Sequence, residues 1–200
     1  MKGVWSVINT EQRQKYNHKK LTVGLFGTCD NIMWREKQFI PKYKELGIKY
    51  YNPVLENWSE ILEMSRKGLC PNPTEEENYY LNNAEIILFP VLKDSLGSGS
   101  LAEMGFSVQR VVRNIMNGGQ QFLVGLIDDI CTDERKTEAE RKQSTKDRAL
   151  VKSKFIENVS YPVITIVNNL DEMLQMSLTA YDMLGQEVSH SNDLVADKAV

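Results

Sequence analysis

Residues 84–106 read AEIILFPVLKDSLGSGSLAEMGF, and the fold expected for this chain is built around them. Ile86–Val91 is a short, uninterrupted apolar run, which is typical of a strand covered on both faces. In the polar loop after it, Gly97 and Gly99 let the backbone approach a ligand closely. A helical pattern begins at Leu101, so the stretch predicts a strand, a loop and a helix in succession.

Glu103 has two interpretations. Ser100 is a candidate N-cap, and Glu103 follows it at the spacing of a capping box, so helix stability alone would account for the carboxylate. In the functional interpretation, Glu103 lies at the carboxyl edge of a sheet, where open α/β folds bind ligands. This stretch by itself leaves both interpretations open.

Short β-rich runs alternate with helical patterns along the rest of the chain. Further strands are predicted over residues 21–27, 48–51, 121–127 and 162–167. Helices are predicted over residues 33–46, 54–64, 74–83, 101–116 and 170–184, with Ser59 and Thr74 as candidate N-caps. Glu77 follows Thr74 at the capping-box spacing, which offers a structural account of that carboxylate as well.

This alternation predicts parallel strands joined by right-handed crossovers, and therefore one doubly wound α/β domain. We expect the flavodoxin-like (Rossmann-like) strand order 2-1-3-4-5 in a five-stranded parallel sheet. In that order the loops after the first and third strands face each other across one crevice.

The domain is expected to span residues 21–185, with an N-terminal extension over 1–20 and a loose C-terminal tail over 186–200. Residues 129–155 form a densely charged insertion in which both signs are intermixed. Such a pattern predicts a solvent-exposed helix with ion pairs four residues apart.

Composition excludes several classes of protein. The net charge of −3 argues against a nucleic-acid binder, and no apolar run is long enough to cross a membrane. The three cysteines form no C-x-x-C pair, which indicates free thiols in a reducing cytoplasm. With only two histidines, a multi-histidine metal centre is not expected, and no secretory signal is evident.

The common nucleotide and hydrolase motifs are missing. The first strand runs into GTCDNI without the glycines of a dinucleotide fingerprint, and neither a P-loop nor a G-x-S-x-G elbow occurs. What remains at the crevice is a set of carboxylates, hydroxyls and aromatics. Two carboxylates near a sugar are what glycosyl transfer needs, because one captures or stabilises an oxocarbenium-like carbon while another group protonates the leaving atom. The set is Thr28, Asp30, Trp34, Arg35, Asn52, Glu77, Asp94, Ser95, Ser98, Ser100 and Glu103.

Three motifs carry a resemblance to a known family. They are LFGTCDNIMWRE over 25–36, YYNPVLENW over 50–58, and NNAEIILFPV over 82–91 followed by SLGSGSLAEMGF over 95–106. Together they resemble the nucleoside 2-deoxyribosyltransferase-like family, across roughly Leu21–Val111. The related deoxynucleoside 5′-monophosphate N-glycosidases have the same architecture and a similar loop. The insertion around 133–154 and both tails have no counterpart in this pattern.

The resemblance implies a pentosyltransferase in which Glu103 attacks C1′ of a 2-deoxynucleoside, releases the nucleobase and holds a covalent glycosyl-enzyme. Glu77 would orient or protonate the base, and Ser98 and Ser100 would hold the 5′ end of the sugar or a 5′-phosphate, assisted by Arg35. It also implies a cytoplasmic enzyme of nucleotide metabolism without a cofactor, and a homo-oligomer in which a neighbouring subunit often completes the site. The remaining residues expected to bind substrate are Gly27, Thr28, Asp30, Trp34, Asn52, Gly99 and Met104.

Two other functions stay open: hydrolysis of the same bond, and a catalytically silent module that binds a nucleotide as a sensor. The charged insertion gives the sensor hypothesis some support. Several residues also have purely structural interpretations. Trp34 and Trp58 suit core packing, Arg35 a surface charge paired with a nearby acid, and Asp30 a turn.

Overall fold

The computed structural model describes residues 21–28, 33–55, 57–157 and 161–196, with side chains up to Gly185. Its strands are all parallel and form one five-stranded sheet in the order β2-β1-β3-β4-β5, which confirms the predicted doubly wound α/β fold. The strands are β1 (Thr22–Leu25), β2 (Lys49–Tyr51), β3 (Ile86–Val91), β4 (Phe122–Ile127) and β5 (Ile164–Val167).

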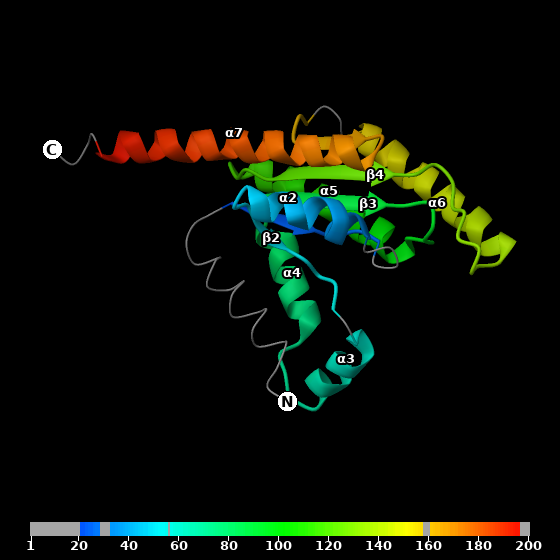
Figure 1. Cartoon of the computed structure of the whole chain (residues 1–200). Helices are drawn as coiled ribbons and strands as arrows, with labels where there is room; N and C mark the ends of the chain where they lie inside the picture. The colour runs from blue at the N-terminus through cyan, green and yellow to red at the C-terminus, as the bar shows by residue number, and fades with distance from the viewer. Residues whose placement is uncertain (1–20, 29–32, 56, 158–160, 197–200) are drawn as a thin grey trace.

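Helices cover both faces of the sheet (Figure 1). The π-helical turn η1, the helix α2 that continues it, and α7 pack on one face, while α5, α6 and the end of α4 pack on the other. Among the described helices, none is both long and apolar enough to cross a membrane. The helices are η1 (Arg35–Phe39), α2 (Ile40–Glu45), α3 (Trp58–Arg66), α4 (Pro73–Asn83), α5 (Ser98–Met116), α6 (Glu138–Glu157) and α7 (Leu170–Ala196).

The strand β3 lies at the centre of the sheet, and all of its residues are buried. Ile86 and Leu88 point into the core beneath α7, while Ile87, Phe89 and Val91 point into the core beneath α5. The two-residue period of a strand thus supplies both cores, which is why this run is apolar at every position.

The ends of β1 and β3 approach each other closely where the strand order reverses. Thr28 N donates to Pro90 O at 3.0 Å. Gly27, which precedes Thr28 and also lies against Pro90, has a φ of 97°. A Cβ at Gly27 would lie 2.5 Å from Pro90 O, so only glycine fits there without strain. This contact brings the two loops of the predicted crevice side by side.

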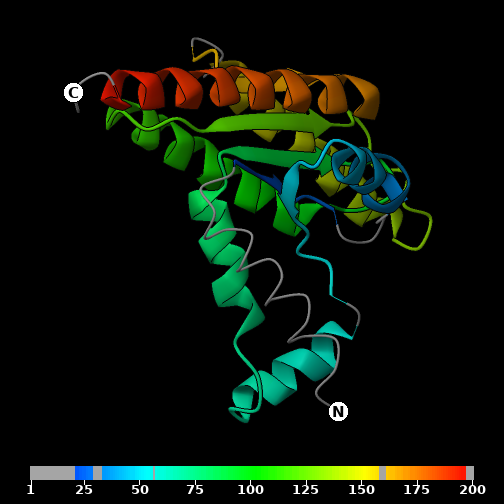
Figure 2. The ribbon, with the colours of Figure 1, turned by 60° about the vertical axis from the view of Figure 1, so that its left-hand side comes forward.

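The helices α3 and α4 form an arm that extends from the carboxyl side of β2 and returns to β3 (Figures 1 and 2). The arm begins at Asn57, which has a φ of 61°. Because α4 returns to the sheet, residues on both helices can reach the carboxyl edge of the strands.

Helix starts differ from the predicted ones. The N-caps are Asn57, Asn72 and Gly97, not Ser59, Thr74 and Ser100. At α4, the Asn72 side chain accepts a hydrogen bond from Thr74 N at 3.1 Å, and Pro73 occupies the first helical position, where its fixed φ suits a helix start.

Two further boundaries correct the sequence analysis. The charged helix α6 begins only at Glu138, after an ordered loop. Residues 186–196, predicted to be a loose tail, continue α7 to Ala196, because one glycine at 185 costs a helix only about 1 kcal/mol and does not end it. The predicted extension over 1–20 and the last residues of the predicted tail, 197–200, lie outside the described residues.

Candidate active site

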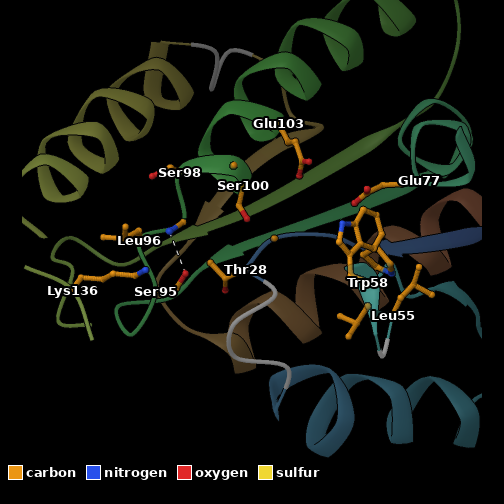
Figure 3. Close-up of a pocket in the computed structure, with 15 residues that line it drawn as sticks. Thr28, Leu55, Trp58, Glu77, Ser95, Leu96, Ser98, Ser100, Glu103 and Lys136 are labelled. Carbon is orange, nitrogen blue, oxygen red and sulfur yellow. Dashed lines mark hydrogen bonds between the residues drawn. The ribbon is translucent and has the colours of Figure 1, made fainter. Parts of the chain in front are cut away.

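A cavity of about 570 Å³ opens at the carboxyl edge of β1 and β3 (Figure 3). This volume is in the range of small-molecule sites, and the position is the crevice where doubly wound folds bind ligands. Its wall combines the loops after β1, β2 and β3 with residues of α3, α4 and α5, and with one residue from the loop before α6.

Glu103 of α5 and Glu77 of α4 both line this cavity, and their carboxylates point toward each other in Figure 3. Because α5 starts after Gly97 and α4 after Asn72, neither carboxylate stands at the third helical position that a capping box requires. The capping interpretations of both residues are therefore wrong.

The environment of the two carboxylates raises the pKa of each. Burial raises the pKa of Glu103 above its usual range. For Glu77, burial is the largest cause and the negative charge of Glu103 adds to it, so that its pKa rises to about 7 although Arg35 pulls it down. Glu77 is thus the carboxyl that holds a proton near neutral pH, an acid facing a potential nucleophile.

Opposite Glu77, the loop between β3 and α5 and the first turn of α5 form the other end of the cavity. Ser98, Gly99 and Ser100 line it, and Ser95 accepts a hydrogen bond on its Oγ from Gly97 N at 3.2 Å. Thr28 adds a hydroxyl that donates to Pro90 O at 3.3 Å. This end offers hydroxyls and the first amides of α5 to a ligand.

Residues of the predicted insertion hold the loop between β3 and α5 in place through hydrogen bonds. Every main-chain carbonyl from Val91 to Leu96 accepts a hydrogen bond from a residue between positions 131 and 148. Arg148 of α6 contributes most, since it is fully buried and donates to the carbonyls of Val91, Leu92, Ser95 and Asp128. With its carbonyls bound on the α6 side, the loop is held in one position beside the cavity.

The expected site residues divide into three groups. The cavity wall contains Gly27, Thr28, Glu77, Ser98, Gly99, Ser100 and Glu103. Asp30 lies outside the described residues. The wall does not include Trp34, Arg35, Asn52 or Met104, whose expected contact with substrate finds no support in this arrangement.

The residues outside the wall support the site from the core. Arg35 is fully buried, so its interpretation as a surface charge is wrong; its guanidinium donates to the carbonyls of Leu25, Phe26, Gly27 and Thr28. Trp34 packs in the core at 4.3 Å from that guanidinium, as its structural interpretation predicted. Met104 is also a core residue, and Asn52 accepts a hydrogen bond from Val54 N at 3.3 Å.

Sequence reasoning missed several residues of the cavity wall, and two of them, Trp58 and Lys136, have an aromatic or charged group to offer a ligand. Trp58, interpreted as packing, is 39% exposed and lies beside Glu77 in Figure 3, where Leu55 accompanies it. Lys136 comes from the loop before α6 and lines the opposite end. Trp58 could have been found, since its motif was quoted for the family resemblance. Lys136 gave no signal, because it is one lysine in a densely charged segment.

No three histidine, cysteine, aspartate or glutamate side chains of the described chain gather in a way that could hold a metal ion. In comparisons with known proteins, no family model and no curated protein matches this chain.

Proposed function

We propose that this chain is an enzyme that breaks the N-glycosidic bond of a 2-deoxynucleoside or its 5′-monophosphate and transfers the deoxyribosyl group to a second nucleobase. The observation that carries the proposal is the pair of facing carboxylates, Glu103 and Glu77, in one cavity, with the pKa of Glu77 raised to about 7. The motifs that resemble the nucleoside 2-deoxyribosyltransferase-like family contribute Glu103 itself and the loop beside it.

In the first half of the reaction, the Glu103 carboxylate attacks C1′, a C1′–O bond forms and the C1′–N bond breaks. The departing base takes the proton of Glu77, so the leaving group is neutral and Glu77 becomes a carboxylate. In the second half, a nitrogen of the acceptor base attacks C1′, Glu103 is released and Glu77 recovers a proton. Each carboxyl thus returns to its starting state.

The two ends of the cavity suit the two ends of such a substrate. Leu55 and Trp58 provide an apolar and aromatic wall beside Glu77, where a planar base would stack. The hydroxyls of Ser98 and Ser100 face the side where the sugar would extend. Glu103 lies between the two ends, at the place where the bond to be broken would lie.

The test is incubation of the protein with each common 2-deoxynucleoside and its 5′-monophosphate, together with a different free base, followed by chromatography of the products. We expect the exchanged compound to form. Glu103→Gln should lower the rate by about three orders of magnitude or more, as loss of a catalytic nucleophile does. The variant should keep the wild-type circular dichroism spectrum. An unchanged rate in Glu103→Gln would refute the assignment of the nucleophile.

The same assay separates transfer from hydrolysis, because release of base at equal rates with and without an acceptor would indicate that water resolves the intermediate. Saturable binding without any product would indicate a binding module instead. The charged insertion, which suggested that module, has a sufficient role in holding the loop between β3 and α5.

A further inference from the structure

The cavity has an uneven distribution of charge along its length. Of its two carboxylates, Glu77 lies beside the end that Trp58 walls off, and Glu103 faces Glu77 from α5. At the other end, beside Ser95 and Leu96, the charged residue that the structure places in the wall is Lys136. A ligand that fills the cavity therefore meets an apolar surface at one end and a cation at the other.

Lys136 is held in place by its main chain. Its amide donates to Asp133 O at 3.1 Å, and its carbonyl accepts a hydrogen bond from Arg141 at 2.6 Å. The ammonium itself makes no hydrogen bond or ion pair with any residue that the structure describes. The backbone thus directs this lysine to the cavity, while its charge stays available to a ligand.

Two acids lie within electrostatic reach of Lys136, but neither forms an ion pair with it in the part of the chain that the structure describes. Asp133 is within electrostatic reach but forms a paired contact with Arg135, at 2.8 Å and 2.9 Å. Glu140 is also within reach, and it accepts hydrogen bonds from the amide and hydroxyl of Thr137. An anionic group of the ligand would be the direct counter-ion of Lys136.

We propose that Lys136 selects a 5′-phosphate, so that the substrate of this site is a 2-deoxynucleoside 5′-monophosphate in preference to the free nucleoside. The inference rests on the proposed function. With C1′ at Glu103 and the base against Trp58, the 5′ carbon extends toward Ser98 and Lys136. A free nucleoside presents a neutral hydroxyl there, whereas a monophosphate presents a dianion to a cation and to hydroxyl donors.

Two measurements on the full chain test this. The first is the ratio of kcat/KM for each 2-deoxynucleoside 5′-monophosphate to that for its nucleoside. We expect this ratio to exceed one in the wild type. Lys136→Ala should lower it by about ten- to a hundredfold, the effect of losing one charge-assisted hydrogen bond, and Lys136→Arg should largely preserve it. Lys142→Ala is the matched control, because Lys142 lies in the same insertion but pairs with Glu138 outside the cavity wall.

The second measurement is calorimetric binding to Glu103→Gln of the monophosphate, the nucleoside, 2-deoxyribose 5-phosphate and inorganic phosphate. We expect the monophosphate to bind most tightly, and Lys136→Ala in the same background to weaken it more than the nucleoside. Lys136-dependent binding of the monophosphate to this variant, together with no base release by the wild type, would support recognition of the 5′-phosphate by Lys136 but would overturn the proposed function, and with it the role of the monophosphate as a substrate.

Four results would overturn the inference. If base exchange occurs but the free nucleoside is the better substrate, or if Lys136→Ala affects both substrates equally, the proposed function stands and the role of Lys136 falls. If inorganic phosphate binds as tightly as the monophosphate, the site recognises a phosphate ion and not a nucleotide. Absence of both binding and turnover would refute the two proposals together.

Discussion

Glu77 and Glu103 have the same side chain, but only for Glu77 does a neighbouring negative charge add to the effect of burial on the pKa. Both are partly buried, yet the repulsion between them falls on Glu77, whose pKa rises to about 7. A pair of like charges in a partly closed site keeps one proton between them, and the carboxyl with the higher pKa holds it. At the scale of single residues, the environment therefore determines which carboxyl holds the proton near neutral pH.

This assignment predicts the pH dependence of activity. If Glu77 must be protonated, kcat should fall as pH rises through about 7, the value to which its pKa is raised. Glu77→Gln should lower kcat by about 10²–10⁴-fold and abolish this alkaline decline, because the amide does not ionise. Steady-state rates between pH 5 and 9 measure both. A decline of unchanged midpoint in Glu77→Gln would mean that another group titrates.

Stability should respond to pH in the same direction. Between the usual 4.5 and about 7, the folded protein holds a proton on Glu77 that the unfolded chain has released. The free energy of unfolding therefore falls as pH rises through this window. Relative to Glu77→Gln, the wild type should lose about 1–2 kcal/mol, a value discounted because the carboxyl is partly exposed to the cavity. Urea denaturation at pH 5 and pH 7.5 measures the difference.

At the scale of elements, hydrophobic patterns predicted more than the capping signals did. The strands were found within a few residues, because an apolar run such as Ile86–Val91 reports burial directly. The capping boxes at Ser100 and Thr74 failed, because residues two or three positions earlier begin those helices. A local capping pattern cannot reveal that Gly97 adopts a left-handed conformation, since Arg148 of α6, which lies near Gly97, comes much later in the sequence.

The role of α6 could not be predicted for a related reason. Arg148 is one of several cations in a charged helix, and nothing in its neighbourhood in sequence distinguishes it. Its burial depends on carbonyls of the loop after β3, more than fifty positions earlier in the chain. The sequence analysis counted the charges of this helix correctly but could not identify the one that faces inward.

Arg148→Met tests the contribution of α6 as an element. The substitution removes the guanidinium hydrogen bonds to the carbonyls of Val91, Leu92 and Ser95, each of which keeps one other donor, so we expect the free energy of unfolding to fall by about 2 kcal/mol or more. Lys142→Met, on the exposed side of the same helix, should change it by less than about 0.5 kcal/mol. Urea midpoints with unchanged slopes give the comparison. Equal effects of the two substitutions would show that the loop does not depend on Arg148.

At the scale of the whole molecule, the strand order determined which distant residues meet. The order 2-1-3-4-5 followed from the alternation of strands and helices, and it correctly brought the loops after β1 and β3 together. The arm formed by α3 and α4 was predicted only in part. Its helices were predicted, but the path that carries Trp58 and Glu77 back over the carboxyl edge depends on packing that no local pattern encodes.

The contact that joins the two halves of the crevice is the approach of Gly27 to Pro90, and a matched pair of substitutions isolates it. Gly27 and Gly47 both have positive φ values, 97° and 66°, so alanine strains the backbone at either position. A Cβ at Gly47 meets open space, whereas one at Gly27 lies 2.5 Å from Pro90 O. Gly47→Ala should therefore cost about 1–2 kcal/mol of stability, and Gly27→Ala should cost at least about 1 kcal/mol more through overpacking.

The two variants should also differ in activity. To accept the extra methyl group, the end of β1 must move away from β3, which shifts Thr28 relative to Ser98 and Glu103 on the other side of the cavity. We expect Gly27→Ala to lower kcat/KM by about a hundredfold, the scale expected when reacting groups are displaced by 1 Å, while Gly47→Ala keeps the wild-type value. Kinetics at a temperature where both variants remain folded separates this effect from stability. Wild-type activity in Gly27→Ala would show that the crevice tolerates displacement of its two loops, and that the spacing at Pro90 maintains the fold without setting the geometry of the site.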